Sequence, residues 1–260
     1  MESQAAGPET GEVRTVKIAT AGDIHCRETN RDQILEAFAG LDRDTDLVLL
    51  AGDLTSHGTP EEAAILADAV EPLDCPVYTV MGNHDWHADR VGEITEVLEG
   101  AGIKVLERQA EIGVFREVEV GVVGLKGFIG GFAPEHLPDF GEPLLRDVYA
   151  ETTADVEALD EGLREIATCA IRIVLLHYSP SQATLEGEPR GIHVFLGTDR
   201  LAAPILQHGP AAVFHGHAHA GTFEGRIDEV PVYNVSVPVI KRDFHVVEMK
   251  AELGSPGPIH

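Results

Sequence analysis

The sequence predicts an α/β fold in which parallel strands alternate with helices and end at a polar site. Short apolar runs rich in Val, Ile and Leu alternate with amphipathic helical stretches through the first half of the chain, a pattern typical of right-handed βαβ units. Apolar runs of the same kind return in the second half. Five of these runs end in clusters of Asp, Asn or His residues, so these polar residues are expected at strand ends.

Each expected element follows from its residue pattern. Residues 46–51 read DLVLLA, a continuous apolar run that indicates a parallel strand buried on both faces. Residues 60–70 begin with Pro-Glu-Glu, which favours a first helical turn, and then place apolar side chains on one stripe. We expect strands at residues 16–19, 46–51, 76–80, 171–176, 211–214, 230–235 and 244–249, antiparallel strands within 111–125, and helices at residues 32–39, 60–70, 91–98 and 155–170.

We expect one folded domain at residues 13–250, because no stretch of the 260-residue chain resembles a linker. Residues 1–12 are expected to form a flexible leader and residues 251–260 a flexible tail. Residues 127–141 are rich in Gly, Pro and Phe and predict an irregular loop. The longer segment 126–151 is expected to shape a binding pocket.

Composition limits the cellular context of the protein. No apolar run approaches the roughly 20 residues that a membrane helix needs, and the polar start of the chain does not resemble a secretory signal. Cys26, Cys75 and Cys169 are odd in number and lack CxxC spacing, which favours reduced thiols over a disulfide framework or a zinc knuckle. We therefore expect a cytoplasmic protein without a membrane partner.

The chain is strongly acidic. It has 19 Lys and Arg residues against 44 Asp and Glu residues, which gives a formal net charge of −25. Such a surface repels phosphate backbones, so long nucleic acids and anionic membranes are unfavourable partners. A small phosphorylated substrate remains compatible with this charge, because bound divalent metals reverse the sign of the field locally.

Polar clusters directly follow five of the expected strands. They are GDIH at 22–25, GDLT at 52–55, GNHD at 82–85, HYSP at 177–180 and HGHAH at 215–219. In open α/β sheets the ligand site lies beyond the carboxyl ends of the strands. The five clusters can therefore converge on one place.

Seven side chains in these clusters have the chemistry of metal ligands. Asp23 and His25 are two residues apart, as are His217 and His219, so each pair can point the same way in an extended segment. The two oxygens of Asp53 could bridge two cations. Mixed nitrogen and oxygen donors suit Mn, Fe, Zn, Ni or Co better than Mg or Ca. The candidate metal ligands are Asp23, His25, Asp53, Asn83, His177, His217 and His219.

Two residues of the third cluster have a different expected role. His84 follows Asn83, so its ring can face the site without binding a metal, and Asp85 could orient that ring through a hydrogen bond. Taken singly, each motif is better explained by a polar loop or turn. Three histidines within residues 215–219 are harder to explain by packing. The ordered set predicts two metals about 3.5–4 Å apart, the arrangement that assists displacement at phosphorus.

The series GDIH, GDLT, GNHD, a lone His and GHAH resembles the calcineurin-like metallophosphoesterase superfamily over Asp23 to His219. The resemblance implies a four-layer α/β/β/α sandwich of two mixed β-sheets flanked by helices, with a dinuclear metal site at the strand ends. It also implies two divalent transition metal ions as cofactors. The first would be held by Asp23, His25, Asp53 and His219, and the second by Asp53, Asn83, His177 and His217.

The same resemblance implies the reaction. A hydroxide bridging the ions would attack phosphorus, and His84, supported by Asp85, would donate a proton to the leaving oxygen. We therefore expect a hydrolase of phosphate mono- or diesters of small molecules. One alternative is a manganese-dependent DNA nuclease, which the negative charge and the lack of a basic stripe disfavour. The other is a non-catalytic metal-binding scaffold of the same fold, which the complete ligand set disfavours.

Other residues are weaker candidates. His215 is expected to be structural or to support the metal ligands. Lys126 lies in a glycine-rich stretch, and contact with a substrate phosphate and a simple tight turn are equally compatible with that pattern. Solvent exposure is the favoured interpretation for His57 and His87, either of which could line the cleft, and for Arg27 and Arg190, which are further candidates.

Overall fold

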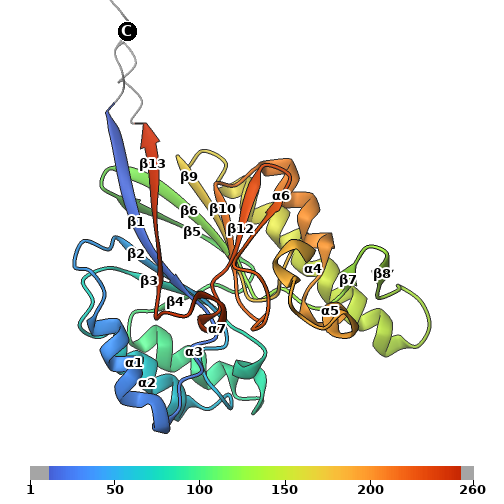
Figure 1. The fold of residues 1–260 in the computed structure, drawn as a ribbon, viewed down its shortest axis with the longest axis horizontal. Helices are drawn as coiled ribbons and strands as arrows, with labels where there is room; N and C mark the ends of the chain where they lie inside the picture. Colours follow the sequence, from blue (N-terminus) through green and yellow to red (C-terminus); the bar gives the residue numbers. More distant parts are fainter. Residues whose placement is uncertain (1–11, 253–260) are drawn as a thin grey trace, which may run out of the picture.

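Two β-sheets pack face to face in the computed structural model, and helices cover the outer side of each sheet (Figure 1). The structure describes residues 12–252. Three apolar cores separate the layers, one between the sheets and one under the helices on either side. The expected four-layer α/β/β/α sandwich of two mixed sheets is therefore confirmed.

The first sheet is built largely from the amino-terminal half of the chain. Its strands are β1 (Val13–Ala21), β2 (Leu47–Ala51), β3 (Val77–Val80), β4 (Lys104–Val105) and β13 (His245–Glu252). They are ordered β13-β1-β2-β3-β4, with β1 to β4 parallel and β13 antiparallel to β1. Its outer face is covered by α1 (Arg31–Ala39), α2 (Pro60–Val70) and α3 (Val91–Gly100).

The second sheet comes from the later part of the chain. Its strands are β5 (Gln109–Phe115), β6 (Val118–Leu125), β9 (Ile171–Leu176), β10 (Ala212–His215), β11 (Glu224–Ile227) and β12 (Val230–Asn234). They are ordered β11-β12-β10-β9-β6-β5, with antiparallel strands only at the two edges. The helices α4 (Pro143–Glu165) and α6 (Ala202–His208) cover its outer face.

Strand β2 explains why a continuous apolar run is needed at the centre of this fold. Its side chains alternate between two cores: Leu47 and Leu49 pack between the sheets with Phe214, whereas Val48 and Leu50 pack under the helices. All five side chains are fully buried. A strand buried on both faces has no solvent side, so the hydrophobic run at 46–51 shows no alternation.

The three helices of the first sheet begin and end close to their expected positions. Helix α2 occupies the expected residues Pro60–Val70. The side chain of Thr59 caps it by accepting a hydrogen bond from the backbone N–H of Glu62 at 3.3 Å. Pro60 follows in the first turn, where its missing N–H leaves no hydrogen bond unmade.

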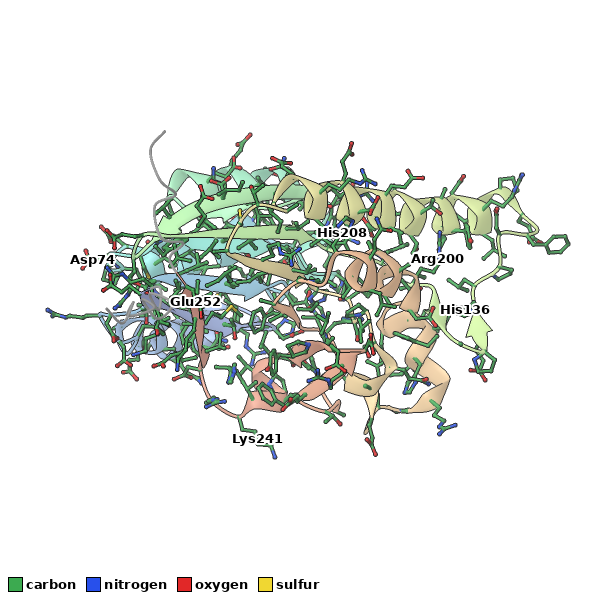
Figure 2. The ribbon with its side chains drawn as sticks, turned by 90° about the horizontal axis from the view of Figure 1, so that it is seen from above. Asp74, His136, Arg200, His208, Lys241 and Glu252 are labelled. Atoms are coloured by element: carbon green, nitrogen blue, oxygen red, sulfur yellow. The ribbon has the colours of Figure 1, made fainter. Side chains whose placement is uncertain are left out.

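The helix expected at residues 155–170 is α4, which spans Pro143–Glu165. It therefore begins well before the expected start and ends before the expected end. Its first turns, up to residue 151, are largely exposed and project beyond the second sheet at the same end of the molecule as His136 (Figures 1 and 2). Inward packing begins at Thr152. The expected start was wrong because a helical segment without a buried face leaves no apolar periodicity in the sequence.

Other departures are local. The stretch 127–141, expected to be irregular, contains a hairpin of β7 (Gly131–Phe132) and β8 (Glu135–His136). Helix α6 was not expected, and its seven residues are too few to show a helical period. The expected domain end at 250 is two residues short, because Ala251 pairs with Arg14 and Glu252 with Val13. The rest of the expected tail, and the expected leader up to residue 11, lie outside the described residues.

Two expectations drawn from composition concern cysteines and membranes. All three cysteines are free thiols, and Cys26 and Cys169 are buried. Across residues 12–252, no helix combines the length and the apolar character needed to span a membrane.

The contact between α4 and β6 depends on a glycine. A Cβ atom added at Gly162 would lie 2.6 Å from Cγ1 of the buried Val123. We expect Gly162→Ala to lower the free energy of unfolding by about 1–3 kcal/mol, because the added methyl overpacks this core. Gly100→Ala is the matched control, since an added Cβ there meets no atom within 4 Å; it should raise stability by roughly 0.5–1 kcal/mol. Urea unfolding of both variants would measure the difference, and equal effects would contradict the packing argument.

Candidate metal centre

Loops following β1, β2, β3, β9 and β10 meet at one edge of the sandwich. Each loop carries one of the polar clusters expected at a strand end. The structure brings all seven candidate ligands together there: Asp23, His25, Asp53, Asn83, His177, His217 and His219. Their metal-binding role stays a prediction. The positions of their donor atoms, described below, indicate which metals they could bind.

Four of the seven residues have a strained backbone. The φ angle is 58° at Asp23, 45° at His25, 50° at Asp53 and 69° at His217. Residues other than glycine rarely adopt this left-handed region, and each instance costs on the order of 1–3 kcal/mol. Such strain is concentrated at functional sites, where the surrounding structure holds it in place.

Glycines in the motifs allow the loops to approach one another. A Cβ atom added at Gly82 would overlap the carboxylate of Asp53, and one added at Gly216 would overlap the carboxylate of Asp23. In both cases the ligand comes from a different loop. The glycines of GNHD and GHAH are therefore required by close packing between ligand loops.

The donor atoms form two groups. In the first, one donor atom from each of Asp23, His25, Asp53 and His219 lies within 4.8 Å of the others. In the second, donors from Asp53, His177 and His217 meet the same limit. The Oδ1 atom of Asn83 lies 3.0 Å from Nε2 of His177, which places Asn83 beside the second group.

Asp53 belongs to both groups, and its two oxygens face different partners. Its Oδ2 lies 3.8 Å from Nε2 of His25 in the first group, and its Oδ1 lies 3.4 Å from Nε2 of His177 in the second. Oδ1 also accepts a hydrogen bond from the backbone N–H of His84 at 2.8 Å. With one oxygen facing each donor group, Asp53 is placed as a carboxylate that bridges two metals would be.

Backbone carbonyls orient the two histidine rings of the second group. Nδ1 of His177 lies 2.9 Å from the carbonyl oxygen of Ala51, and Nε2 of His217 lies 3.1 Å from that of Phe195. Each carbonyl can accept the N–H of the ring, which leaves the other ring nitrogen unprotonated and available to a metal. Metal-binding histidines commonly have such a partner.

The electrostatics favour the metal-binding protonation state at Asp23, His217 and His25, whereas the hydrogen bond to Asp23 raises the pKa of His219. Burial alone would raise the pKa of the Asp23 carboxyl, but the hydrogen bond from His219 and the nearby histidines lower it to about 2. Burial, followed by the neighbouring His177, lowers the pKa of His217 to about 3. Burial also lowers the pKa of His25. At neutral pH these groups are therefore a carboxylate and neutral imidazoles, as ligation requires.

His84 faces the first group without belonging to it. Its ring lies edge-on to that of His25, with centroids 4.6 Å apart. Nδ1 of His84 lies 2.8 Å from the carbonyl oxygen of Ser56. The Nε2 atom makes no hydrogen bond to the described residues and is available to a substrate.

Asp85 does not orient the ring of His84, so that expectation needs correction. Its buried carboxylate accepts hydrogen bonds from the backbone N–H groups of Gly82, at 2.8 Å, and Thr55, at 2.8 Å, and from that of Leu54 at 3.2 Å. Consecutive residues of a 3₁₀ turn point in different directions, which separates Asp85 from His84. Asp85 instead ties the second and third ligand loops together.

The weaker candidates lie around this centre. Buried His215 contacts Thr184 through Nε2 at 2.8 Å, and burial lowers its pKa to about 4, which fits a structural role. Lys126 donates to the carbonyl of Gly127 at 3.0 Å and lies over aromatic rings. It forms no hydrogen bond with either donor group. His57, His87, Arg27 and Arg190 are exposed, as expected.

Four contributors to the site are not predicted by the sequence. The ring of Tyr178 packs against those of His177 and His217, with centroid distances of 5.3 and 4.4 Å. The carbonyls of Ala51, Ser56 and Phe195 orient histidine rings. Tyr178 could have been identified from its position next to His177, whereas every residue has a carbonyl and no side-chain pattern marks the one that is used.

The donor set fits divalent transition metals. Each group offers carboxylate oxygen together with imidazole nitrogen, and Asn83 adds a neutral oxygen. Such mixed donors suit Mn, Fe, Co, Ni or Zn. With Asp53 shared, two such ions would have about four protein ligands each, which leaves coordination positions for water and substrate.

Comparison with known proteins identifies the same architecture. A family model described as calcineurin-like phosphoesterase matches residues 16–221. A Synechococcus protein named "Probable cyclic nucleotide phosphodiesterase" is 36% identical over 96 residues, which cover 32% of this chain and 36% of that protein. An Arcobacter nitrofigilis protein named "Probable glycerophosphodiester phosphodiesterase" is 48% identical over 40 residues, or 15% of each chain. The chain thus matches well under two thirds of the length of either relative.

Solved structures share the fold. The phosphopantetheinyl hydrolase of Mycobacterium tuberculosis superposes with a TM-score of 0.65 at 16% identity, over 89% of this chain and 95% of that one. The Thermus thermophilus protein TT1561 gives a TM-score of 0.57 at 17% identity, over 85% and 89% of the two chains. At these identities the likeness concerns the fold alone.

The short helix α5 (His193–Leu196) holds the ring of His217 through Phe195, and Gly197 fixes this helix in place. A Cβ atom at Gly197 would overlap the carbonyl oxygen of Ser179. We expect Gly197→Ala to displace α5 and weaken metal binding at the second group roughly 10–100-fold, the usual effect of losing a supporting partner. Manganese titration by calorimetry would measure this.

Gly191→Ala is the matched control for this prediction. It places the same methyl in the same segment, where nothing lies within 4 Å. Metal affinity of this variant should equal that of the unsubstituted chain. If both variants bind manganese with unchanged affinity, α5 does not position His217.

Proposed function

Because the chain belongs to the calcineurin-like phosphoesterase family, we propose that it is a metal-dependent hydrolase of small-molecule phosphodiesters. Phosphoester hydrolysis follows from the family. The metal-dependent mechanism is supported by one observation: two donor groups share Asp53, and His84 lies beside them with a ring nitrogen that makes no hydrogen bond to the described residues. The names of the two curated relatives, both phosphodiesterases, agree with this proposal.

The charges around the site support a diester over a monoester. Among residues 12–252, no Lys or Arg forms a hydrogen bond or an ion pair with a candidate ligand or with His84, and this holds also for Arg27, whose exposed side chain lines a hollow beside the first group. A phosphomonoester carries about two negative charges and three terminal oxygens, and sites for such groups commonly add Arg or Lys donors. A diester carries one charge and two terminal oxygens, so the metals alone can neutralise it.

Two divalent ions held by these groups would activate a water molecule and neutralise charge on the phosphate oxygens. The protein supplies the proton for the leaving group. The Ser56 carbonyl accepts the Nδ1–H of His84, so the proton that His84 can transfer is the one on Nε2. It would pass to the leaving alkoxide oxygen as the bond to phosphorus breaks.

A substrate panel with manganese tests the proposed function. We expect bis(p-nitrophenyl) phosphate to exceed p-nitrophenyl phosphate in kcat/KM by at least roughly tenfold, because only the monoester needs additional cationic side chains. Cyclic nucleotides and glycerophosphodiesters extend the panel to natural diesters. A preference for the monoester would contradict the diester assignment, and robust cutting of duplex DNA at physiological salt would favour the nuclease alternative.

His84→Ala tests the acid role. We expect kcat to fall by about 10²–10⁴-fold for diesters with alkyl leaving groups, which need a proton. Esters of p-nitrophenol should lose far less, because p-nitrophenolate leaves without protonation. Metal content should persist, since His84 lies outside both donor groups.

His87→Ala is the control for this prediction. His87 is an exposed histidine whose ring centroid is 6.0 Å from that of His84. Its replacement should leave both classes of ester unaffected. Equal losses for good and poor leaving groups in His84→Ala would refute the acid role.

A further inference from the structure

A hollow of about 210 Å³ opens beside the first donor group. It is lined by residues of α1 and of the start of α7 (Val237–Ile240). His25 lines this hollow and also belongs to the first donor group. The hollow therefore adjoins the first donor group, where the phosphate of a substrate would lie.

The inner walls of the hollow are apolar and partly aromatic. The rings of Phe38 and Phe244 meet edge to face, with centroids 5.0 Å apart. Ile34 and Val237 line the same space from α1 and α7. Apolar walls of this kind favour a flat hydrophobic group, since aromatic contacts add to the area removed from water.

The rim of the hollow is polar. Arg27, Gln33 and Asp243 are exposed and line it. Within residues 12–252, neither Arg27 nor Asp243 forms an ion pair, so their charged groups are available. The side chain of Asn30 is already hydrogen-bonded: it accepts from the backbone N–H of Arg27 at 2.9 Å and donates to the carbonyl of His25 at 3.1 Å. These bonds connect the rim of the hollow to the loop that carries the ligand His25.

We propose that this hollow is the subsite for the alcohol that stays on phosphorus when the diester is cleaved, and that it takes a planar aromatic group. The inference rests on the proposed diesterase function. The volume is smaller than the roughly 300–1,000 Å³ of pockets that hold whole ligands, so the hollow holds one ring system of a substrate. Its apolar walls and hydrogen-bonding rim suit an aryl ring or the heteroaromatic base of a nucleoside.

Three diesters with a common p-nitrophenolate leaving group test the subsite. They are methyl, phenyl and thymidine-5′ p-nitrophenyl phosphate, and only the second alcohol differs. We expect kcat/KM for the phenyl and thymidine esters to exceed that for the methyl ester by roughly tenfold or more. A higher value for thymidine than for phenyl would identify the base as the group recognised, and the reverse order would identify a simple aryl group.

Ala37→Phe should abolish this preference. Ala37 lines the hollow from α1, so an added ring fills the space while the donor groups stay untouched. The loss in kcat/KM should be larger for the phenyl and thymidine esters than for the methyl ester, so that the three values become similar. Ala39→Phe is the matched control, because Ala39 is exposed on the same helix and does not line the hollow; it should keep the preference.

Val237→Phe fills the hollow from the opposite wall. It tests the same loss of preference if Ala37→Phe does not fold. Thermal midpoints and metal content should match the unsubstituted chain in every variant compared. An unsubstituted chain without preference among the three esters, or a filled variant that retains the preference, would overturn the subsite. If the metal-loaded chain hydrolyses none of the three esters, the proposed function itself is wrong.

Discussion

The carboxylate of Asp53 is the constraint around which the strand-end loops are arranged. Its two oxygens face the two donor groups, and one of them also receives the N–H of His84. Three loops must therefore approach one side chain that is 1% exposed. The glycine at position 82 and the left-handed backbone of Asp53 itself make that approach feasible. The strain of this arrangement is tolerated because the buried sheets beneath the loops fix where each loop begins.

Face-to-face packing of the sheets sets the geometry of the site. The first sheet supplies Asp23, His25, Asp53, Asn83 and His84, and the second supplies His177, His217 and His219. Hydrogen bonds cross between the sheets at this edge: the N–H of His217 donates to Asp23 at 2.9 Å, and His177 contacts the carbonyl of Ala51. Each donor group contains residues of both sheets. A change in sheet spacing would therefore alter both groups at once.

The sequence predicts the parts of this structure that depend on side-chain chemistry. The apolar run at 46–51 predicts a buried strand because both faces of β2 face a core. The ordered motifs predict which residues meet, because parallel strands bring their carboxyl ends to one edge. The exposed start of α4 leaves no such pattern, and the orientation of His84 by Ser56 depends on a carbonyl common to every residue. The position of Asp85 required knowledge of a single 3₁₀ turn.

An acidic chain and a small anionic substrate are compatible because exposed charges act only over short distances in salt solution. The formal charge of −25 is spread over the whole chain, and solvent screens exposed charges beyond a Debye length of about 10 Å. A long polyanion must lie along this surface and is repelled at many points. A small ester meets only the donor groups, where bound divalent metals would outweigh the carboxylates of Asp23 and Asp53. The charge distribution is therefore compatible with the small phosphodiester that we propose as the substrate, and we expect it to disfavour nucleic acids.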